Sequence, residues 1–384
     1  MSRVKILVAG VGSAGARIVD RTAEALAGAV PVAAIDTDGR TLAEVHATAK
    51  IQIGMSRTGG FGSGGDAELG RMAAEDDLEM VRALLTDVHL AILVAGLGGG
   101  TGSGATPVIV KAAQEAGATT LCVATLPFDF EGPQRKAVAD RARARLRDAC
   151  DALVAVPNER LVEVVGDRGV PETFARTEEL IGEAVSCLCK LITRPGYIRL
   201  GFADLRQVIS RSGGACTLGY GSGRGADKAQ QALAGLLKSP LLEQGRVLES
   251  SRCMLVGIQG GADLTVKEIT EIMKGLSAQA AKDCHISMGT VIEDTWNERL
   301  AITVVASEAA LSMAEDLQQS GETESELDLE GETIKVRRKA GVAQAKLQFD
   351  AASRGRFKDI EPTILDGEDL DIPTFVRKRI PIEK

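Results

Sequence analysis

The sequence contains no apolar run of 18 residues, the approximate length that a membrane-spanning helix needs. Its first residues, MSRVKILVAG, hold too short an apolar run for a secretory signal peptide. We therefore expect a soluble cytoplasmic protein without direct membrane insertion. Hydrophobic residues still make up 45% of the 384-residue chain, which is enough for a sizeable core. At roughly 100–200 residues per domain, the length predicts two or three domains.

Patterns for metal, disulfide and nucleic-acid binding are missing as well. The seven cysteines include no CxxC spacing and no nearby His pair, so we expect buried reduced thiols and no metal site. The three histidines are isolated in the sequence, which favours neither ligand nor base roles. A formal net charge of −8 argues against a general nucleic-acid binder, because phosphate contacts need a basic surface.

Short apolar runs alternate with helical patterns in the first half of the chain. The expected strands lie near Val4–Ala9, Val32–Ile35, Leu90–Ala95, Thr120–Thr125 and Ala152–Val156. Strands that alternate with helices predict a parallel sheet with both faces covered. The fold class is therefore α/β, with a Rossmann-like domain over residues 1–170.

A long helical pattern follows and begins near Pro171, a residue that suits the first turn of a helix. Apolar residues recur at the helix period through Leu180, Leu188 and Ile192. We predict a central helix over residues 171–195 and a smaller α+β domain over 196–312. Its expected strands lie near Cys253–Ile258, His285–Ile292 and Leu300–Ala306.

The composition changes after residue 312. Eight acidic residues and no Lys or Arg lie between Glu315 and Glu332, and a basic stretch follows. Low hydrophobicity and blocks of like charge predict a disordered linker over 313–366. Residues 367–384 combine acids, spaced apolar residues and a basic end, which favours a peptide that folds on a partner over a solvated tail. Its expected contact residues are Asp369, Leu370, Asp371, Ile372, Pro373 and Phe375.

Glycine is abundant, with 43 residues, and three stretches are especially rich in it. Gly10-Val-Gly12-Ser-Ala-Gly15 follows an expected strand and opens a helix. Asp36 stands at the end of the next strand, where a ribose-binding acid belongs in a dinucleotide site. Taken alone, this pattern favours an NAD(P)-dependent oxidoreductase.

The other two stretches favour a different ligand. Gly98–Gly104, with the sequence GGGTGSG, also joins a strand to a helix, and Gly59–Gly65 lies between the two turns. Such turns aim backbone N–H groups and a helix N-terminus at an anion. A dinucleotide needs one such turn, so several converging turns favour a nucleoside triphosphate. The chain has no GK[ST] and is therefore no P-loop protein, and a bound cation would have to offset the phosphate charge.

The GGGTGSG segment is typical of the tubulin/FtsZ superfamily, and the sequence from Val4 to about Ala306 resembles its FtsZ branch. Ile51–Gly54, Pro127–Gly132 and Leu191–Gly196 are also similar. The stretch Asp369–Lys378 resembles the terminal peptide by which that family docks on membrane-tethering partners. The resemblance implies a GTPase that polymerises head to tail into protofilaments, forms the cytokinetic ring at mid-cell and binds tethering and regulatory division proteins.

The resemblance also implies a set of GTP contacts, with Mg²⁺ and K⁺ as accompanying ions. The implied phosphate cradle consists of Gly12, Ser13 and Gly15 together with Gly98, Gly99, Gly100, Thr101, Gly102, Ser103 and Gly104. Glu131 corresponds to a ribose-binding acid, Arg135 to a nearby basic contact and Phe174 to an aromatic ring packed on guanine.

Several of the implied GTP contacts depart from the family pattern. The family usually has Asn where this chain has Arg17, Asp36 and Glu178, and Asp where it has Glu179. Glu179 keeps a carboxylate for the N–H edge of guanine, and Arg17 would supply positive charge near the phosphates. We therefore keep all four residues as candidate GTP contacts.

The largest departure lies in the loop that reaches the neighbouring subunit's nucleotide in that family. In that family the loop has an Asn, an Asp two positions later and a second Asp three positions after that. The corresponding residues here are Arg199, Gly201 and Asp204. Orienting a water against the γ-phosphate needs such polar groups. Asp204 is the candidate catalytic residue, and Arg199 is a candidate arginine finger. The altered loop leaves ordinary hydrolysis, slow hydrolysis and a divergent co-assembling member as alternatives.

Overall fold

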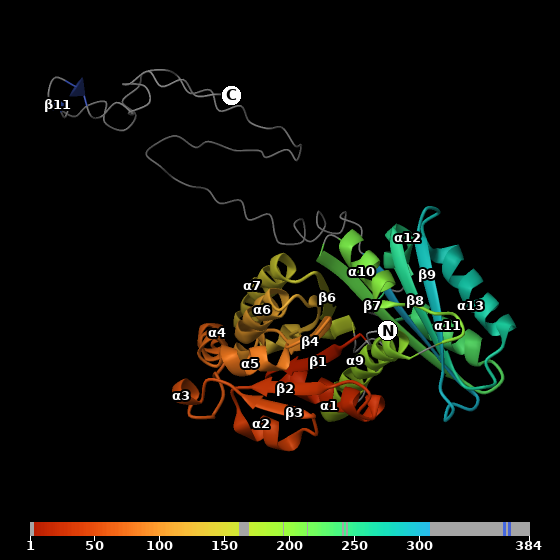
Figure 1. Ribbon diagram of the computed structural model, residues 1–384, viewed down its shortest axis with the longest axis horizontal. Coiled ribbons are helices and arrows are strands. Elements are labelled where there is room, and N and C mark those ends of the chain that lie inside the picture. Colours follow the sequence, from red (N-terminus) through yellow and green to blue (C-terminus); the bar gives the residue numbers. More distant parts are fainter. Residues whose placement is uncertain are drawn as a thin grey trace. The chain divides into compact units, whose positions relative to one another are not determined.

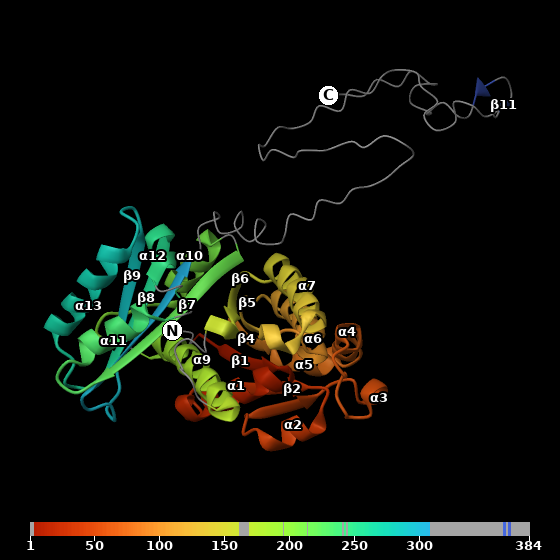
Figure 2. The same cartoon turned by 180° about the vertical axis from the view of Figure 1, so that it is seen from behind.

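The computed structural model describes residues 4–160, 169–194, 196–212, 214–239, 242, 245–307, 364–365 and 368–369. One compact unit spans Met1–Ser320 and a second spans Gly321–Lys384. Figures 1 and 2 show the first unit from opposite sides, with the parallel sheet beside the smaller mixed part.

The first six strands form a parallel sheet, and the apolar runs predict all of them except β3 (Ala49–Gln52). They are β1 (Ile6–Val11), β2 (Val32–Asp36), β3 (Ala49–Gln52), β4 (Leu90–Gly96), β5 (Thr119–Leu126) and β6 (Ala152–Pro157), in the spatial order β3-β2-β1-β4-β5-β6. The helices around them are α1 (Gly12–Leu26), α2 (Gly39–Glu44), α3 (Met55–Thr58), α4 (Ala67–Asp76), α5 (Leu78–Leu84), α6 (Gly100–Glu115), η1 (Asp129–Glu131) and α7 (Pro133–Ala149).

Both faces of this sheet are buried. Along β1, Ile6 and Val8 join a core with α1, α2 and α9 (Val170–Thr193), whereas Leu7 and Ala9 join a second core with α4 to α7. Every residue of β1 is buried, which explains why the strand is a continuous apolar run rather than an alternating one. Helices cover the two faces in Figures 1 and 2 accordingly.

The long central helix is α9, which begins one residue before Pro171 and ends two residues before the predicted boundary. Its 24 residues span about 36 Å at 1.5 Å per residue. Buried residues such as Ile181, Val185 and Leu188 face α1 and both parts of the sheet. The helix therefore packs against both the parallel and the mixed portions of the first unit.

The smaller part contains four strands and four helices among the described residues. They are α10 (Phe202–Arg211), β7 (Gly214–Arg224), α11 (Lys228–Leu237), α12 (Arg246–Ser250), β8 (Cys253–Gly260), α13 (Val266–Gln279), β9 (His285–Ile292) and β10 (Arg299–Ser307). β10 pairs antiparallel with β7 and β8, and β9 pairs parallel with β8. Helices α11 and α13 cover one face, and α9 and α10 cover the other.

The two parts share one continuous sheet of ten strands, which the sequence does not predict. Gly214 and Ala215 at the start of β7 pair in parallel with Ala152 and Leu153 of β6. This short pairing covers the open edge of β6 and joins the parallel and mixed portions.

The predicted linker and terminal peptide fall almost wholly outside the described residues. Within 313–384 the described residues are Ile364–Leu365 (β11) and Glu368–Asp369 (β12), which pair antiparallel. Leu370, Asp371, Ile372, Pro373 and Phe375 lie outside the described residues. None of the helices within the described ranges is long and apolar enough to cross a membrane.

Candidate functional site

The glycine-rich stretches meet at the carboxyl ends of the parallel strands. β1 and β4 are neighbours in the sheet, with β2 beyond β1 and β5 beyond β4, so the strand order reverses between them. Ligands of such sheets bind at this switch point. Helices α1 and α6 both begin there, at Gly12 and Gly100, and their first N–H groups have no acceptor within their own helix. The arrangement suits an anion at the two helix N-termini.

A chain of hydroxyl groups joins the loops from three parts of the sequence. The Thr101 Oγ1 lies 2.7 Å from the Thr37 Oγ1 and 3.0 Å from the Ser63 Oγ. Thr37 follows β2, Ser63 belongs to the glycine-rich stretch 59–65, and Thr101 is in the first turn of α6. All three are buried, so the loops are fixed against one another. Thr101 is among the contact residues that the sequence predicts, whereas Thr37 and Ser63 are not, although Ser63 lies within the glycine-rich stretch 59–65.

Glycine is required where the two helix starts approach. Gly12 has a φ of +75°, and a Cβ there would lie 2.8 Å from the Gly102 backbone nitrogen. A Cβ on Gly15 would overlap the Val94 carbonyl oxygen. Gly12 and Gly15 therefore bring α1 against β4 and α6, while the neighbouring Ser13 donates a hydrogen bond to Asp36 at 3.0 Å.

The seven residues of GGGTGSG have different tasks. A Cβ on Gly100 would overlap the Ser63 Oγ and the Asp66 backbone just before α4. A Cβ on Gly104 would overlap the Ala67 carbonyl oxygen in α4, and a Cβ on Gly102 would overlap the Gly96 carbonyl oxygen. Gly98 has a φ of +99°, and its N–H donates to the Ser103 Oγ at 2.9 Å. Gly99 has open space where a Cβ would stand. Much of the motif therefore serves close packing of α6, and its open side lies at Gly99.

Asp36 is buried and turned toward the backbone, with 1% of its surface exposed. Its Oδ1 accepts hydrogen bonds from the Thr37 N–H at 2.7 Å and from the Asp38 N–H at 3.3 Å. Burial raises the pKa of this carboxyl, and the hydrogen bonds offset only part of that effect. In this arrangement Asp36 orders the turn after β2.

The residues expected around the ribose and base lie on η1, α7 and α9. Glu131 accepts a hydrogen bond from the Phe128 N–H at 2.9 Å and forms an ion pair with Arg135. The Phe174 ring meets Phe128 edge-on at 5.4 Å between centroids, and Phe128 stacks on Phe130 at 4.8 Å. These contacts add Phe128 and Phe130 to the candidate base-binding region, and Phe130 is 77% exposed.

Three of the departures from the family pattern lie together on α1 and α9. The Arg17 Nε donates to the Glu178 Oε1 at 2.6 Å, and the Arg176 guanidinium donates to the Glu179 Oε2 at 2.6 Å. The side chain of Glu178 is 12% exposed, whereas those of Arg17 and Glu179 are about half exposed. Arg17 thus meets a carboxylate across the helix–helix contact.

The candidate catalytic loop lies at the other end of α9. Arg199 is exposed, and Asp204 is in the first turn of α10, where its Oδ2 accepts from the Gly201 N–H at 2.8 Å. Because Phe174 and Glu178 are near the start of α9, about 23–29 Å of helix separates them from this loop. The structure therefore does not bring Arg199 and Asp204 together with the phosphate loops of the same chain.

Known proteins match both parts of the chain. Residues 5–166 match the sequence profile of the Tubulin/FtsZ family, GTPase domain, and residues 214–310 match that of the FtsZ family, C-terminal domain. The cell division protein FtsZ of Buchnera aphidicola is 33% identical over 379 residues, which cover 97% of this chain and 96% of that protein. The chain belongs to the FtsZ family. The cell division protein FtsZ of Methanothermobacter thermautotrophicus is 36% identical over 306 residues, or 80% of each chain.

Solved structures agree with the fold. An FtsZ dimer from M. jannaschii has a TM-score of 0.75 at 32% identity, covering 81% of this chain and 90% of that chain. A GDP-bound CetZ1 monomer from Haloferax volcanii, at 24% identity, covers 82% of this chain and 98% of that chain, and shares the fold with a TM-score of 0.69. The tubulin/FtsZ fold expected from the sequence is therefore confirmed.

Family membership settles the class of activity. The chain is a GTPase of the FtsZ family, whose members are cell-division proteins of the tubulin superfamily, and GTP and GDP are its nucleotides. This assignment overturns the alternative of an NAD(P)-dependent oxidoreductase. Within the described ranges, no group of three or more His, Cys, Asp or Glu side chains could hold a metal ion.

Proposed function

We propose that this chain polymerises head to tail, holds GTP between successive subunits and builds the cytokinetic ring in the cytoplasm at mid-cell. In this arrangement the loop of one subunit, with Asp204 and Arg199, approaches the phosphate loops of the next. Hydrolysis of GTP to GDP and phosphate is then completed in trans. The FtsZ dimer of M. jannaschii supports self-association of this kind.

The separation of the two half-sites carries the proposal. The 24-residue helix α9 begins beside the nucleotide loops and ends three residues before Gly196, at the start of the candidate catalytic loop. Because a helix of this length spans about 36 Å, Asp204 cannot reach a γ-phosphate bound to its own chain. A second copy placed end to end supplies the missing half.

Slow hydrolysis is the second candidate, and the loop residues favour it. Arg199 and Gly201 replace two polar groups of the family pattern, while Asp204 is engaged with the Gly201 N–H. Loss of a positioned polar group typically costs about 10²–10⁴ in rate. Such a chain would form filaments that GTP stabilises and that turn over slowly.

Cations and further partners belong to the same proposal. The carbonyl, hydroxyl and phosphate oxygens of such a site suit Mg²⁺, and K⁺ can neutralise further charge. Arg17 and Arg135, which are near the candidate site, are already paired with Glu178 and Glu131. A bound cation would therefore balance the triphosphate. Residues Asp369–Phe375 would bind membrane-tethering and regulatory division proteins.

The test is GTP turnover measured at increasing protein concentration, with sedimentation of polymer in parallel. Assembly that requires GTP, with a rate per subunit that rises as polymer forms, is the expected result. Polymer with negligible phosphate release would select the slow-hydrolysis candidate. A rate per subunit that stays constant below and above the assembly threshold would exclude completion in trans.

A further inference from the structure

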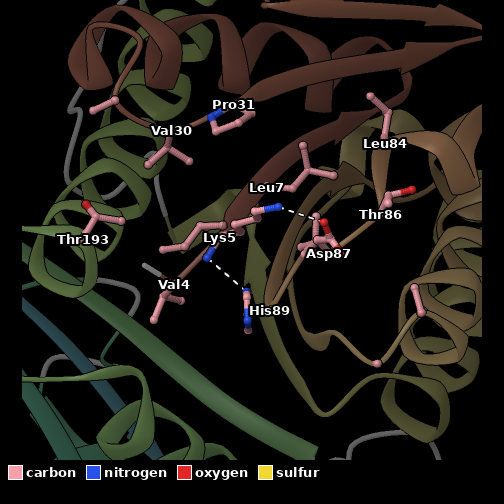
Figure 3. A pocket seen from close by; sticks show the side chains of 15 residues that line it. Val4, Lys5, Leu7, Val30, Pro31, Leu84, Thr86, Asp87, His89 and Thr193 are labelled. Atoms are coloured by element: carbon pink, nitrogen blue, oxygen red, sulfur yellow. Dashed lines mark hydrogen bonds and ion pairs between the residues drawn. The ribbon is translucent and has the colours of Figure 1, made fainter. Parts of the chain in front are cut away.

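A cavity of about 750 Å³ opens at the end of the parallel sheet opposite the phosphate loops. It lies at the amino ends of β1 and β4, beneath the turn that precedes β2 and the turn that precedes β5 (Figure 3). The six residues of β1 separate it from Gly12 by about 20 Å. This basal cavity is therefore distinct from the candidate nucleotide site.

The basal cavity is mainly apolar. Val4, Leu7, Val30, Pro31 and Leu84 line it, and Thr193 at the end of α9 closes one side (Figure 3). Sites for small organic ligands typically measure about 300–1,000 Å³ and combine apolar walls with a few polar groups. The size and lining therefore suit the apolar body of a small molecule.

A histidine with a defined proton position lies at the polar edge of the cavity. The Lys5 backbone N–H donates to the His89 Nδ1 at 3.2 Å, and the Lys5 Nζ forms an ion pair with Asp87 at 2.9 Å (Figure 3). Because Nδ1 accepts a hydrogen bond, the neutral imidazole carries its proton on Nε2. His89 therefore offers an N–H donor at its other ring nitrogen.

A second cavity of about 410 Å³ adjoins the first and shares His89 and Gly117 with it. It is lined by polar side chains that include Arg206 of α10, whose guanidinium carbon lies 5.9 Å from the Phe202 ring centroid. Within the part of the chain that the structure describes, no carboxylate forms an ion pair with Arg206.

The acidic group of the second cavity is already engaged. The Asp151 Oδ2 accepts hydrogen bonds from the Thr120 N–H at 2.7 Å and from the Thr120 hydroxyl at 2.8 Å. The donors around the second cavity are the Arg206 guanidinium, the His89 Nε2–H, the Gln114 amide and the Thr119 hydroxyl, and Arg206 is the cationic one. A guanidinium and a neutral N–H donor recognise a carboxylate, because charge-assisted hydrogen bonds are the stronger ones.

We propose that the two cavities together bind a small amphipathic monoanion. Its apolar body lies in the basal cavity, and its anionic group lies in the second cavity with His89 and Arg206. Phe202 and Arg206 belong to the helix that follows the Gly201 loop, so the ligand contacts the element that carries Asp204.

The chemistry of the ligand can be tested with three probes on the full chain with bound GDP, by isothermal titration calorimetry. Octanoate has both the apolar body and the anion, acetate lacks the body, and octylammonium carries the opposite charge. We expect octanoate to bind at least about tenfold more tightly than either of the others. Acetate loses the burial of the apolar body, and octylammonium loses the charge-assisted hydrogen bonds. Equal binding of octylammonium, or no binding of octanoate, overturns the proposal.

Three variants locate the site. Arg206→Met and His89→Phe remove the donors, and Thr86→Trp fills the basal cavity from its exposed edge. Each should weaken octanoate binding about tenfold, whereas Lys111→Gln, on the exposed face of α6, should leave it unchanged. Thermal unfolding of each variant confirms that it is folded. Octanoate that binds all four variants as it binds the parent chain would overturn the assignment. GDP affinity of the same samples reports on the nucleotide site separately.

Discussion

The Arg17 Nε lies 2.6 Å from the Glu178 Oε1, so an ion pair spans the contact between α1 and α9. By the resemblance in sequence, both residues are expected at positions where the family usually has Asn, and both lie near the candidate base-binding region around Phe174. The Glu178 side chain is only 12% exposed, so without Arg17 its carboxylate would be a nearly buried charge with no ion-pair partner. We therefore expect the two departures from the family pattern to compensate each other.

A double-mutant cycle of Arg17→Asn and Glu178→Asn tests this compensation. We expect each single variant to weaken GTP binding and the double variant to recover part of the loss. The coupling energy should be about 0.5–1 kcal/mol, since one partner is half exposed to solvent. Calorimetric titration with GTP measures this coupling energy. Arg82→Gln is the control, because Arg82 belongs to a remote ion pair with Glu115. Strictly additive effects would contradict the compensation.

Glycine at position 104 is required by helix packing. A Cβ there would overlap the Ala67 carbonyl oxygen and lie 2.6 Å from the Arg71 backbone nitrogen. We expect Gly104→Ala to lower the free energy of unfolding by about 1–3 kcal/mol. Gly235→Ala on α11 is the matched control, because the nearest atom would be 3.8 Å away and Ala favours a helix. Urea unfolding of both variants measures this free energy. A Gly104→Ala variant as stable as the parent chain would refute the packing role.

The elements that the sequence predicts well are those with a single dominant signal. The strand over His285–Ile292 matches its predicted bounds, and α9 lies within two residues of its own. β7 gave no such signal, because Gly219, Gly221 and Gly223 interrupt its pattern. A Cβ at these positions would collide with Leu242, the Ala232 carbonyl oxygen and the Lys228 carbonyl oxygen. The absence of side chains at these glycines lets α11 and Leu242 pack closely on the strand. This is a tertiary requirement that no local pattern reveals.

In the candidate site too, local patterns predict some features and only the folded chain reveals the others. The three glycine-rich stretches were recognised because each has a local pattern and an expected strand or helix beside it. The contact between Thr37 and Thr101 joins residues 64 positions apart, and the contact between Ser63 and Thr101 joins residues 38 apart. Single threonines and serines are common in turns, so only the folded chain identifies these. The close packing of Gly104 likewise depends on α4, a helix for which the sequence offers no clear pattern.

Asp36 makes stability depend on pH. Burial raises its pKa above the ordinary value of 3.8, so the folded protein favours the protonated form more than the unfolded chain does. The stability that this proton contributes is fully present below pH 3.8 and is lost as the pH rises through the raised pKa. We expect Asp36→Asn, which keeps the shape and an acceptor for the Thr37 N–H, to be more stable than the parent at pH 7.

The measurement is urea unfolding of both proteins between pH 4 and pH 8 at matched GDP concentration. The advantage of the Asn variant should grow as the pH rises. An advantage that is independent of pH would assign the effect to packing rather than to the charge. Asp38→Asn is the contrasting control, because Arg40 lowers the pKa of that half-buried carboxyl.

Asp204 has two separable roles, one in the fold and one in the proposed reaction. Its Oδ2 accepts from the Gly201 N–H at the start of α10, and its charge is the one carboxylate left in the family's loop pattern. Asp204→Asn keeps the acceptor and removes the charge, whereas Asp204→Ala removes both. We expect a loss of about 1 kcal/mol in stability for the Ala variant only. GTP turnover by polymer should fall about 10²–10⁴-fold in both.

Mixing two variants then tests whether the carboxylate acts on a neighbour. Asp204→Asn retains its nucleotide loops, and Gly12→Ala retains its Asp204 while a Cβ 2.8 Å from the Gly102 nitrogen disturbs its phosphate cradle. In a mixed filament, the intact loop of one variant faces the intact nucleotide of the other. Turnover by the mixture should therefore exceed that of either variant alone at the same total concentration. A mixture no faster than the better variant, with co-sedimentation established, would mean that Asp204 serves the fold of its own chain and takes no part in hydrolysis.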